Sequence, residues 1–177
     1  MTEKIEYERI YLRKLCEEDA SESYVSWLND PVVNQYLDNV CRENHTVESV
    51  REFIKNLNTK GEEILFGIFL KNSDKHIGNI KIGPINQMHK LADVGFIIGD
   101  KSEWGKGYAA EAIKAVTVYS FDSLRLNKLS AGLYASNVQS ARTLEKAGFK
   151  KEGHRIKHYI LKGEPHDIIE YGVCNDG

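Results

Sequence analysis

A strand-like run, a short turn with two glycines and a helix-like run follow one another in the middle of this chain. Residues 93–99 have the composition of a strand, and residues 104–112 carry the turn and the start of the helix. The first turn of a helix leaves backbone N–H groups without partners, and the helix dipole favours negative charge there. Gly105 and Gly107 let the backbone approach a ligand closely and accept positive φ. This order of elements predicts a binding site for a pyrophosphate group.

The apolar pattern changes its period along the chain. In the first third we expect a strand at residues 9–15, a helix at 17–28, a short helix opened by Pro31 through Tyr36 or Leu37, and a helix at 46–57 capped by Thr46. Beyond it we expect strands at 64–71, 76–82, 91–99 and 128–135, helices at 108–120 and 137–147, and two strands after Phe149. The strands at 64–71 and 76–82 are joined by a hairpin-like connection.

This order of elements predicts an α+β fold, with a mixed central sheet flanked by helices, in a single domain over residues 1–177. With 41% hydrophobic and 28% charged residues, the composition is that of a soluble globular protein with a sizeable core. A net charge of −2 favours neither a nucleic-acid nor a membrane partner. The apolar runs are short, and the first residues have no apolar segment, so we expect neither a membrane span nor a secretory signal.

The three cysteines, Cys16, Cys41 and Cys174, are far apart and form no Cys-x-x-Cys pair. An odd number of scattered thiols argues against a disulfide framework, so we expect a cytoplasmic protein with reduced thiols. His154 and His158 are four residues apart in a strand-like segment, which would put both on one face. No carboxylate or cysteine pattern completes a metal site around them, and we expect no bound metal.

A second motif occupies residues 137–149. Asn137 is a good N-cap, Ser140 lies one turn later on the same face, and Gly148 is a natural residue to end the helix. Taken alone, this segment is a capped surface helix, and the turn at residues 105–107 is an ordinary glycine turn. The chain has no Gly-x-Ser-x-Gly elbow of a serine hydrolase, and its glycine turn lacks the ending of a Walker loop.

Taken together, in this order and at this spacing, the two motifs resemble those of the GNAT superfamily of acyl-CoA-dependent N-acetyltransferases. The resemblance covers essentially the whole chain. The strand at residues 9–15, the break at 27–31 and the ending at 166–171 are similar to the Rim-type branch, which contains ribosomal-protein N-terminal acetyltransferases. Where the family commonly has Arg or Gln at the start of the phosphate loop, this chain has Trp104.

The resemblance implies acetyl-CoA as co-substrate. In the family's manner, backbone N–H groups of the loop would take the pyrophosphate, and the strand before the loop would pair with the pantetheine arm. N–H groups around Ile97 and Ile98 are candidates to polarise the acyl carbonyl. The resemblance assigns donor binding to Phe96, Ile97, Ile98, Trp104, Gly105, Lys106, Gly107, Tyr108, Ala109, Asn137 and Ser140.

The resemblance also implies direct attack of an amine on the thioester, without a covalent enzyme intermediate. The attacking ammonium must first lose a proton, and Asp93, which opens the strand that carries the donor, is the first candidate for the base. Glu111 is a weaker option, because an acid in the first turn of a helix also serves the dipole. Many family members have a Tyr acid seven residues after the Asn, but this chain has Leu144 there. Ser140 is then the group expected near the sulfur.

The acceptor stays open at this level. A protein N-terminus, an amino sugar on a nucleotide carrier, a polyamine and a small antibiotic all suit the resemblance. The acceptor pocket is expected from the helices around Trp27 to Tyr36, the loop at residues 84–90 and the C-terminal strands. A non-catalytic acyl-CoA-binding or sensing domain of the same fold is an alternative to which Leu144 adds weight. A monomer and a homodimer are equally compatible with the sequence.

Overall fold

The computed structural model describes residues 4–37 and 40–176. The elements, with η marking 3₁₀ helices, are β1 (Lys4–Tyr7), β2 (Ile10–Lys14), η1 (Glu17–Asp19), α1 (Glu22–Asn29), η2 (Val40–Arg42), α2 (Val47–Lys60), β3 (Ile64–Leu70), β4 (His76–Asn86), β5 (Leu91–Ile98), η3 (Lys101–Glu103), α3 (Tyr108–Asp122), β6 (Lys128–Tyr134), α4 (Val138–Lys146), β7 (Lys150–Leu161) and β8 (Glu164–Cys174).

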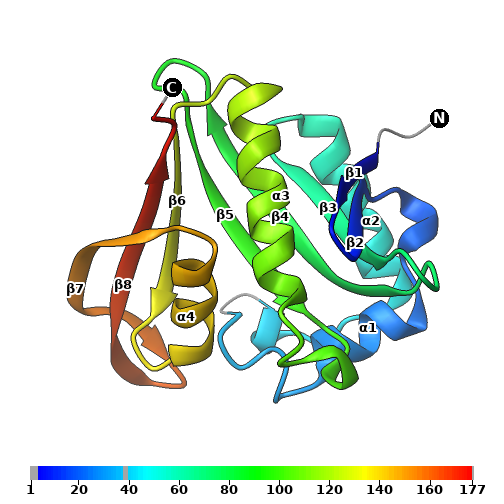
Figure 1. Ribbon diagram of the computed structural model, residues 1–177. Helices are drawn as coiled ribbons and strands as arrows, with labels where there is room; N and C mark the ends of the chain where they lie inside the picture. The colour runs from blue at the N-terminus through cyan, green and yellow to red at the C-terminus, as the bar shows by residue number, and fades with distance from the viewer. Residues whose placement is uncertain (1–3, 38–39, 177) are drawn as a thin grey trace.

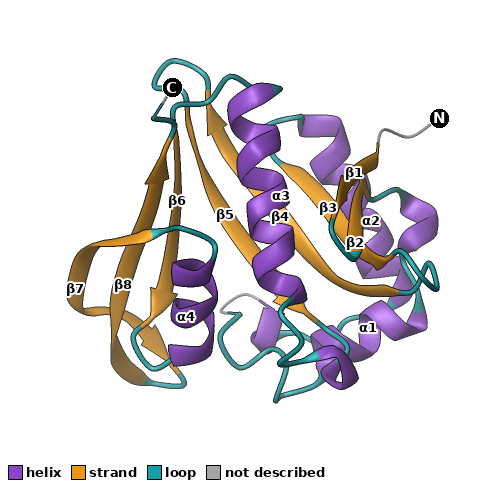
Figure 2. Cartoon of the chain, in the orientation of Figure 1, coloured by secondary structure: helices purple, strands orange, loops and turns teal. Residues whose placement is uncertain are grey.

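Within these described residues, eight strands form one sheet in the order β1-β2-β3-β4-β5-β6-β8-β7 (Figure 1). Neighbouring strands are antiparallel except β5 and β6, which run parallel. Helices cover both faces of the sheet, α3 and α4 on one and α1 and α2 on the other (Figure 2). The predicted α+β fold, a mixed sheet flanked by helices, is therefore confirmed.

Strand β3 shows how one sheet serves two cores. Its residues are buried almost throughout, because both of its faces are covered. Phe66 and Ile68 belong to the main core under α3, whereas Leu65 and Phe69 point to the second core under α1 and α2. This alternation, with a period of two residues, is what a strand between two helical layers requires.

Two predictions for the segment before α2 are wrong. The helix expected at residues 17–28 is broken, because the Ser21 side chain caps a new helix by accepting the N–H of Tyr24 at 3.2 Å. The short helix expected after residue 31 is instead a series of turns. There the Asp30 carboxylate accepts the N–H of Val32 at 2.9 Å, and a short polar side chain that binds nearby backbone competes with helix formation.

The remaining expected elements are present, with some shifts at their ends. Thr46 caps α2 as predicted, accepting the N–H of Ser49 at 3.1 Å. Strand β4 continues past residue 82 to Asn86, because a bulge after Ile82 lets it regain pairing with β5 at Ile85. Strand β1 has no counterpart in the sequence prediction, since its four residues are too few to show a period.

Candidate active site

The two central strands separate after three paired residues. The parallel ladder between β5 and β6 ends with the pair Asp93 and Ser130. Beyond that pair the strands diverge, as Figure 1 shows. A cleft of about 650 Å³ opens there, and residues from β4, β5, β6, α4, β7 and β8 line it. An interrupted ladder in the middle of a sheet leaves strand edges with unused hydrogen-bonding groups, which an extended ligand can occupy.

The edge of β5 that faces the cleft is formed by alternate residues. The N–H of Gly99 donates to Ile77 at 2.9 Å, across the pair with β4. Because backbone groups alternate between the two edges of a strand, Ile97 also turns its groups toward β4, whereas Phe96 and Ile98 turn theirs toward the cleft. Of the three residues predicted to contact the pantetheine arm, Phe96 and Ile98 therefore turn backbone groups toward the cleft, whereas the groups of Ile97 face β4.

The glycine turn leads directly into α3, as predicted. Gly105 and Gly107 have φ of 75° and 89°, a conformation that other residues rarely adopt. Gly107 is the N-cap and provides no side-chain cap. The first three residues of the helix are Tyr108, Ala109 and Ala110. Their N–H groups donate no hydrogen bond within the described residues. These free donors fit a bound pyrophosphate, since nothing else in the turn satisfies them.

Trp104 ties this turn to the end of β5. Its indole N–H donates to the carbonyl of Ile98 at 2.7 Å, and its side chain remains 43% exposed. The tryptophan therefore connects the strand that faces the cleft with the loop that holds the free N–H groups.

A chain of ion pairs supports the loop from the side of β4. Lys75 lies 2.6 Å from Asp100 and 3.3 Å from Glu103, and Lys106 lies 2.8 Å from Glu103. Lys75, together with hydrogen bonds from Ser102, lowers the pKa of Asp100 to about 2. The family resemblance assigned Lys106 to the pyrophosphate. In the structure, its ammonium group is paired with the Glu103 carboxylate.

We expect Asp100→Asn to destabilise the protein by about 1 kcal/mol at pH 7, since a partly exposed ion pair contributes little more. A lowered pKa gives stability that is present above the unfolded value near 4 and is lost as the pH falls toward 2. Urea unfolding at pH 7, 4 and 3 should therefore show the difference from wild type shrinking with the pH. Asp176→Asn, the same change at an exposed site, is the control and should show no such difference. An Asp100→Asn deficit that did not change with pH would contradict this account.

Helix α4 brings the second motif to the cleft. The Asn137 side chain caps the helix by accepting the N–H of Ser140 at 3.2 Å, and both residues line the cleft. The Ser140 hydroxyl makes no hydrogen bond among the described residues. Leu144, one turn further, is 1% exposed and packs into the main core, so it closes the cleft floor with an apolar surface.

Asp93 lies at the point where the strands separate, with its side chain on the wall of the cleft. Partial burial raises the pKa of its carboxyl. The positive charge of Lys81 opposes that shift, and the negative charge of Glu170 adds to it. A carboxyl with a raised pKa at the head of a cleft is suited to exchange a proton with a ligand. Glu111, the weaker candidate, lies outside this lining and binds Arg9 instead.

Strand β7 contributes residues that the sequence did not single out. Between Arg155 and Tyr159 its register to β8 shifts, because two extra residues bulge outward. Asp167 holds this bulge by accepting the N–H of Lys157 at 2.7 Å. The bulge invalidates the expected strand alternation between His154 and His158. His154 lies 2.7 Å from Asp167, whereas His158 and Tyr159 line the cleft.

Three tyrosines from distant parts of the chain gather at the cleft. The ring of Tyr134 lies 6.0 Å from that of Tyr36 and 6.4 Å from that of Tyr159. Tyr36 comes from the segment expected to build the acceptor pocket, but Trp27 of that segment is buried in the second core instead. The rings of Tyr134 and Tyr159 reach Tyr36 only through the alternation of β6 and the bulge in β7, and neither feature is visible in the sequence.

Among the described residues, no three His, Cys, Asp or Glu side chains gather as metal ligands would.

Comparison with known proteins identifies the family. Residues 9–150 match the family model described as an acetyltransferase (GNAT) domain. The chain belongs to the GNAT family. This GNAT protein is an N-acetyltransferase, and two of its relatives match nearly its full length. The uncharacterized N-acetyltransferase p20 of Bacillus licheniformis is 30% identical over 94% of this chain and 93% of its own. The probable N-acetyltransferase YjcK of Bacillus subtilis is 34% identical over 90% of this chain and 92% of its own.

Solved structures have the same fold. An acetyltransferase of the GNAT family from Bacillus anthracis superimposes with a TM-score of 0.83 at 26% identity, covering 97% of this chain and 98% of its own. RimL, a ribosomal L7/L12 acetyltransferase in complex with coenzyme A, has a TM-score of 0.86 at 20% identity, with 98% and 99% coverage. The spermidine N-acetyltransferase of Vibrio cholerae, in complex with CoA and spermine, has a TM-score of 0.82 at 23% identity and covers 94% of this chain and 95% of its own. The last two show the fold alone.

GNAT proteins use acyl-CoA, and the two structures with bound CoA share the fold of this enzyme. In the described part of the chain, no helix is both long and apolar enough to cross a membrane.

Proposed function

We propose that this GNAT enzyme transfers an acetyl group from acetyl-CoA directly to the primary amine of a cationic acceptor. The observation that carries the proposal is the cleft between β5 and β6. The cleft contains Asp93, a carboxyl with a raised pKa, and β5, which lines it, leads through the glycine turn to a helix start with free N–H donors. These are the two things that the reaction requires of the protein: a site for the anionic donor and a base for the amine.

The donor side rests on backbone groups. The free N–H groups at the start of α3 would take the pyrophosphate, and Lys106 would add positive charge. The backbone groups of Phe96 and the N–H of Ile98 would pair with the amides of the pantetheine arm, as an added strand does, while the carbonyl of Ile98 accepts from Trp104. Acetyl-CoA itself supplies an activated acyl group as a thioester.

The acceptor side rests on Asp93. Its carboxylate takes a proton from the ammonium, which leaves a neutral amine able to attack. A backbone N–H on the cleft edge of β5 would bind the carbonyl oxygen as it gains charge. The new C–N bond replaces the C–S bond. The proton that the attacking nitrogen then loses passes to the sulfur, and CoA leaves as the thiol. The Ser140 hydroxyl, which lines the cleft beside this path, would donate a hydrogen bond to the departing sulfur.

The charges of the cleft favour a cationic acceptor. Its positive side chains are already paired, Lys81 with Glu63 at 2.7 Å and Arg155 with Glu170 at 2.7 Å. Asp93 has no ion-pair partner among the described residues. The phosphates of a nucleotide-linked amino sugar would need free cations, and the described lysine and arginine side chains of the lining are both paired.

The tyrosine rings at the cleft add to this preference, because ring faces attract ammonium groups. An amine with more than one positive charge also matches the spermine held by the structural neighbour from Vibrio cholerae. A polyamine or a basic small amine is therefore the proposed acceptor class, ahead of a peptide N-terminus or a sugar.

The test is the release of free CoA thiol from acetyl-CoA with a panel of amines: spermidine and other polyamines, N-terminal peptides and nucleotide-linked amino sugars. We expect turnover with the polyamines. Turnover with the sugars alone would overturn the acceptor class. Stabilisation by acetyl-CoA in a thermal melt, with no release for any amine, would indicate a domain that only binds acyl-CoA. A melt without stabilisation would remove the donor assignment itself.

A further inference from the structure

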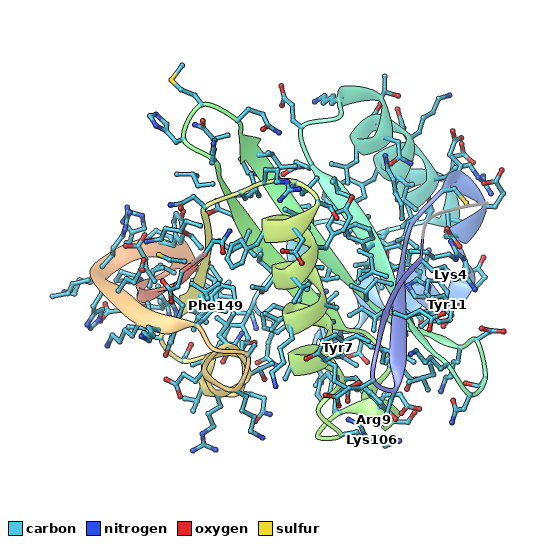
Figure 3. The ribbon with its side chains drawn as sticks, turned by 45° about the horizontal axis from the view of Figure 1, so that its top comes forward. Lys4, Tyr7, Arg9, Tyr11, Lys106 and Phe149 are labelled. Carbon is cyan, nitrogen blue, oxygen red and sulfur yellow. The ribbon has the colours of Figure 1, made fainter. Side chains whose placement is uncertain are left out.

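The turn between β1 and β2 contacts the phosphate loop, which is the glycine turn at residues 104–107. Figure 3 shows Arg9, in this turn, beside Lys106. The Arg9 Nη2 donates to the carbonyl oxygen of Lys106 at 2.8 Å. Its Nε donates to the Glu111 carboxylate at 2.7 Å, and its backbone N–H donates to the other oxygen of that carboxylate at 3.1 Å. The guanidinium carbon also lies 4.6 Å from the centre of the Tyr108 ring. One residue therefore holds three positions in the loop and the first turn of α3.

The pair of Arg9 and Glu111 is well suited to act as a fixed anchor. The Glu111 side chain is only 8% exposed, so its charge depends on the guanidinium for compensation. The backbone bond from Arg9 adds a second constraint, because it fixes the carboxylate to the turn itself. A charge-assisted contact with two carboxylate oxygens is stronger and more directional than a single neutral hydrogen bond.

The contact with Lys106 determines how the next peptide is oriented. In a trans peptide the carbonyl oxygen and the following N–H point in opposite directions. Because Arg9 binds the carbonyl of Lys106, the N–H of Gly107 points to the side away from the guanidinium. That N–H donates no hydrogen bond among the described residues, and neither do those of the first three residues of α3. Gly107 has φ of 89°, so this peptide would have several other orientations without the contact.

We propose that Arg9 is a positioning residue for the acyl donor. It holds the peptide between Lys106 and Gly107 so that the N–H of Gly107 joins those of α3 at the pyrophosphate. Arg9 thus sets the affinity for the nucleotide part of the donor without contacting the acyl group. This inference rests on the proposed use of acetyl-CoA and adds the residue that orders its phosphate site.

The test compares two donors that differ in the pyrophosphate. We expect Arg9→Gln to raise the KM for acetyl-CoA about tenfold or more, with kcat within about threefold, since one charged contact is lost. S-acetyl-pantetheine lacks the pyrophosphate, and its kcat/KM should be the same for Arg9→Gln and wild type. Calorimetric binding of CoA should weaken by the same factor as the KM rises. An equal loss with both donors, or no change in CoA binding, would overturn the proposal.

Two further variants separate the proposal from simpler explanations. Arg9→Gln leaves Glu111 buried without its partner, so Arg9→Gln combined with Glu111→Gln provides a neutral pair that should fold and still bind CoA weakly. Glu111→Gln alone should also weaken CoA binding, because the guanidinium loses its anchor. If Arg9 instead contacted the phosphates directly, Glu111→Gln would leave CoA binding unchanged or make it tighter, and that result would overturn the positioning role.

The matched control is Arg13→Gln. Arg13 also forms a two-bond pair, with Asp19 at 2.6 and 2.8 Å, but on β2 away from the loop. Arg13→Gln should lower the stability of the protein without changing the ratio of the kcat/KM values for acetyl-CoA and S-acetyl-pantetheine. If wild type bound no CoA by calorimetry, the proposed donor would be wrong as well. That failure is distinct from a wild type that binds CoA and an Arg9 variant that binds it equally well.

Discussion

Replacing Asp93 by Asn should lower kcat by about 10²- to 10⁴-fold, the usual contribution of a positioned general base. Asn keeps the size and polarity of the side chain but cannot take the proton of the ammonium. The side chain lies on the cleft wall and outside both cores, so the variant should melt within a few degrees of wild type. The measurement is steady-state release of CoA thiol with the best acceptor of the panel.

The pH dependence gives an independent readout of the same role. The base must be ionised to act, so the rate should rise with pH through the pKa of Asp93. Partial burial sets that pKa above the usual value, despite the opposing charge of Lys81. This acidic limb should be absent in Asp93→Asn, which should show only the titration of the amine itself.

The control is Glu152→Gln, another carboxylate that lines the cleft. Lys128 holds its carboxylate at 2.7 Å, so it is not available as a base. We expect its kcat within about threefold of wild type. An Asp93→Asn enzyme that retained both its rate and the acidic limb would assign the proton to another group, most simply a water chain.

Replacing Gly78 by Ala should destabilise the protein by about 3 kcal/mol, which is near the upper end for overpacking. A Cβ at this position would lie 2.2 Å from the carbonyl oxygen of Ile97 and 2.9 Å from the Cα of Ile98. Both contacts are with backbone, so no side chain can rotate away to relieve them. The variant must push β4 and β5 apart at the strand end that faces the cleft.

Chemical unfolding and a thermal melt measure this effect, with an expected fall in Tm of roughly 6–12 °C for a chain of this size. The matched control is Gly95→Ala on β5, where an added Cβ would meet nothing within 4 Å. It should stay within about 0.5 kcal/mol of wild type. If the two variants were equally stable, β4 and β5 would be able to separate at little cost, and the clash at Gly78 would not limit the stability of the sheet.

The sequence predicted most of the fold because its helices and strands carry strong local signals. Thr46 has a good acceptor at the right place, and the glycine turn before α3 has few alternative conformations. The errors before α2 arise where the side chains of Ser21 and Asp30 bind nearby backbone, an effect that apolar periodicity does not register.

The candidate site divides along the same line. The glycine turn before α3 and the cap at Asn137, on which the donor assignment rests, were predictable because each is a continuous segment. The acceptor side was not, because Tyr36, Tyr134 and Tyr159 come together only through the bulge in β7 and the order of β8 and β7. The contact of Arg9 with the loop was equally hidden, since nothing in a turn near the N-terminus indicates its distant partner.

The three residue pairs that join β5 to β6 have a consequence for how the molecule is assembled. Strands β1 to β5 follow one another through antiparallel neighbours, whereas β6 reaches its place only through the crossover that contains α3. Asp93 belongs to the part before this crossover, the glycine turn at residues 104–107 lies within the crossover, and Asn137 and Ser140 belong to the part after it. Neither part alone holds a complete site. Substrate recognition therefore requires the crossover that forms the parallel pair of the sheet, so we expect a folding intermediate with only its local hairpins formed to have no activity.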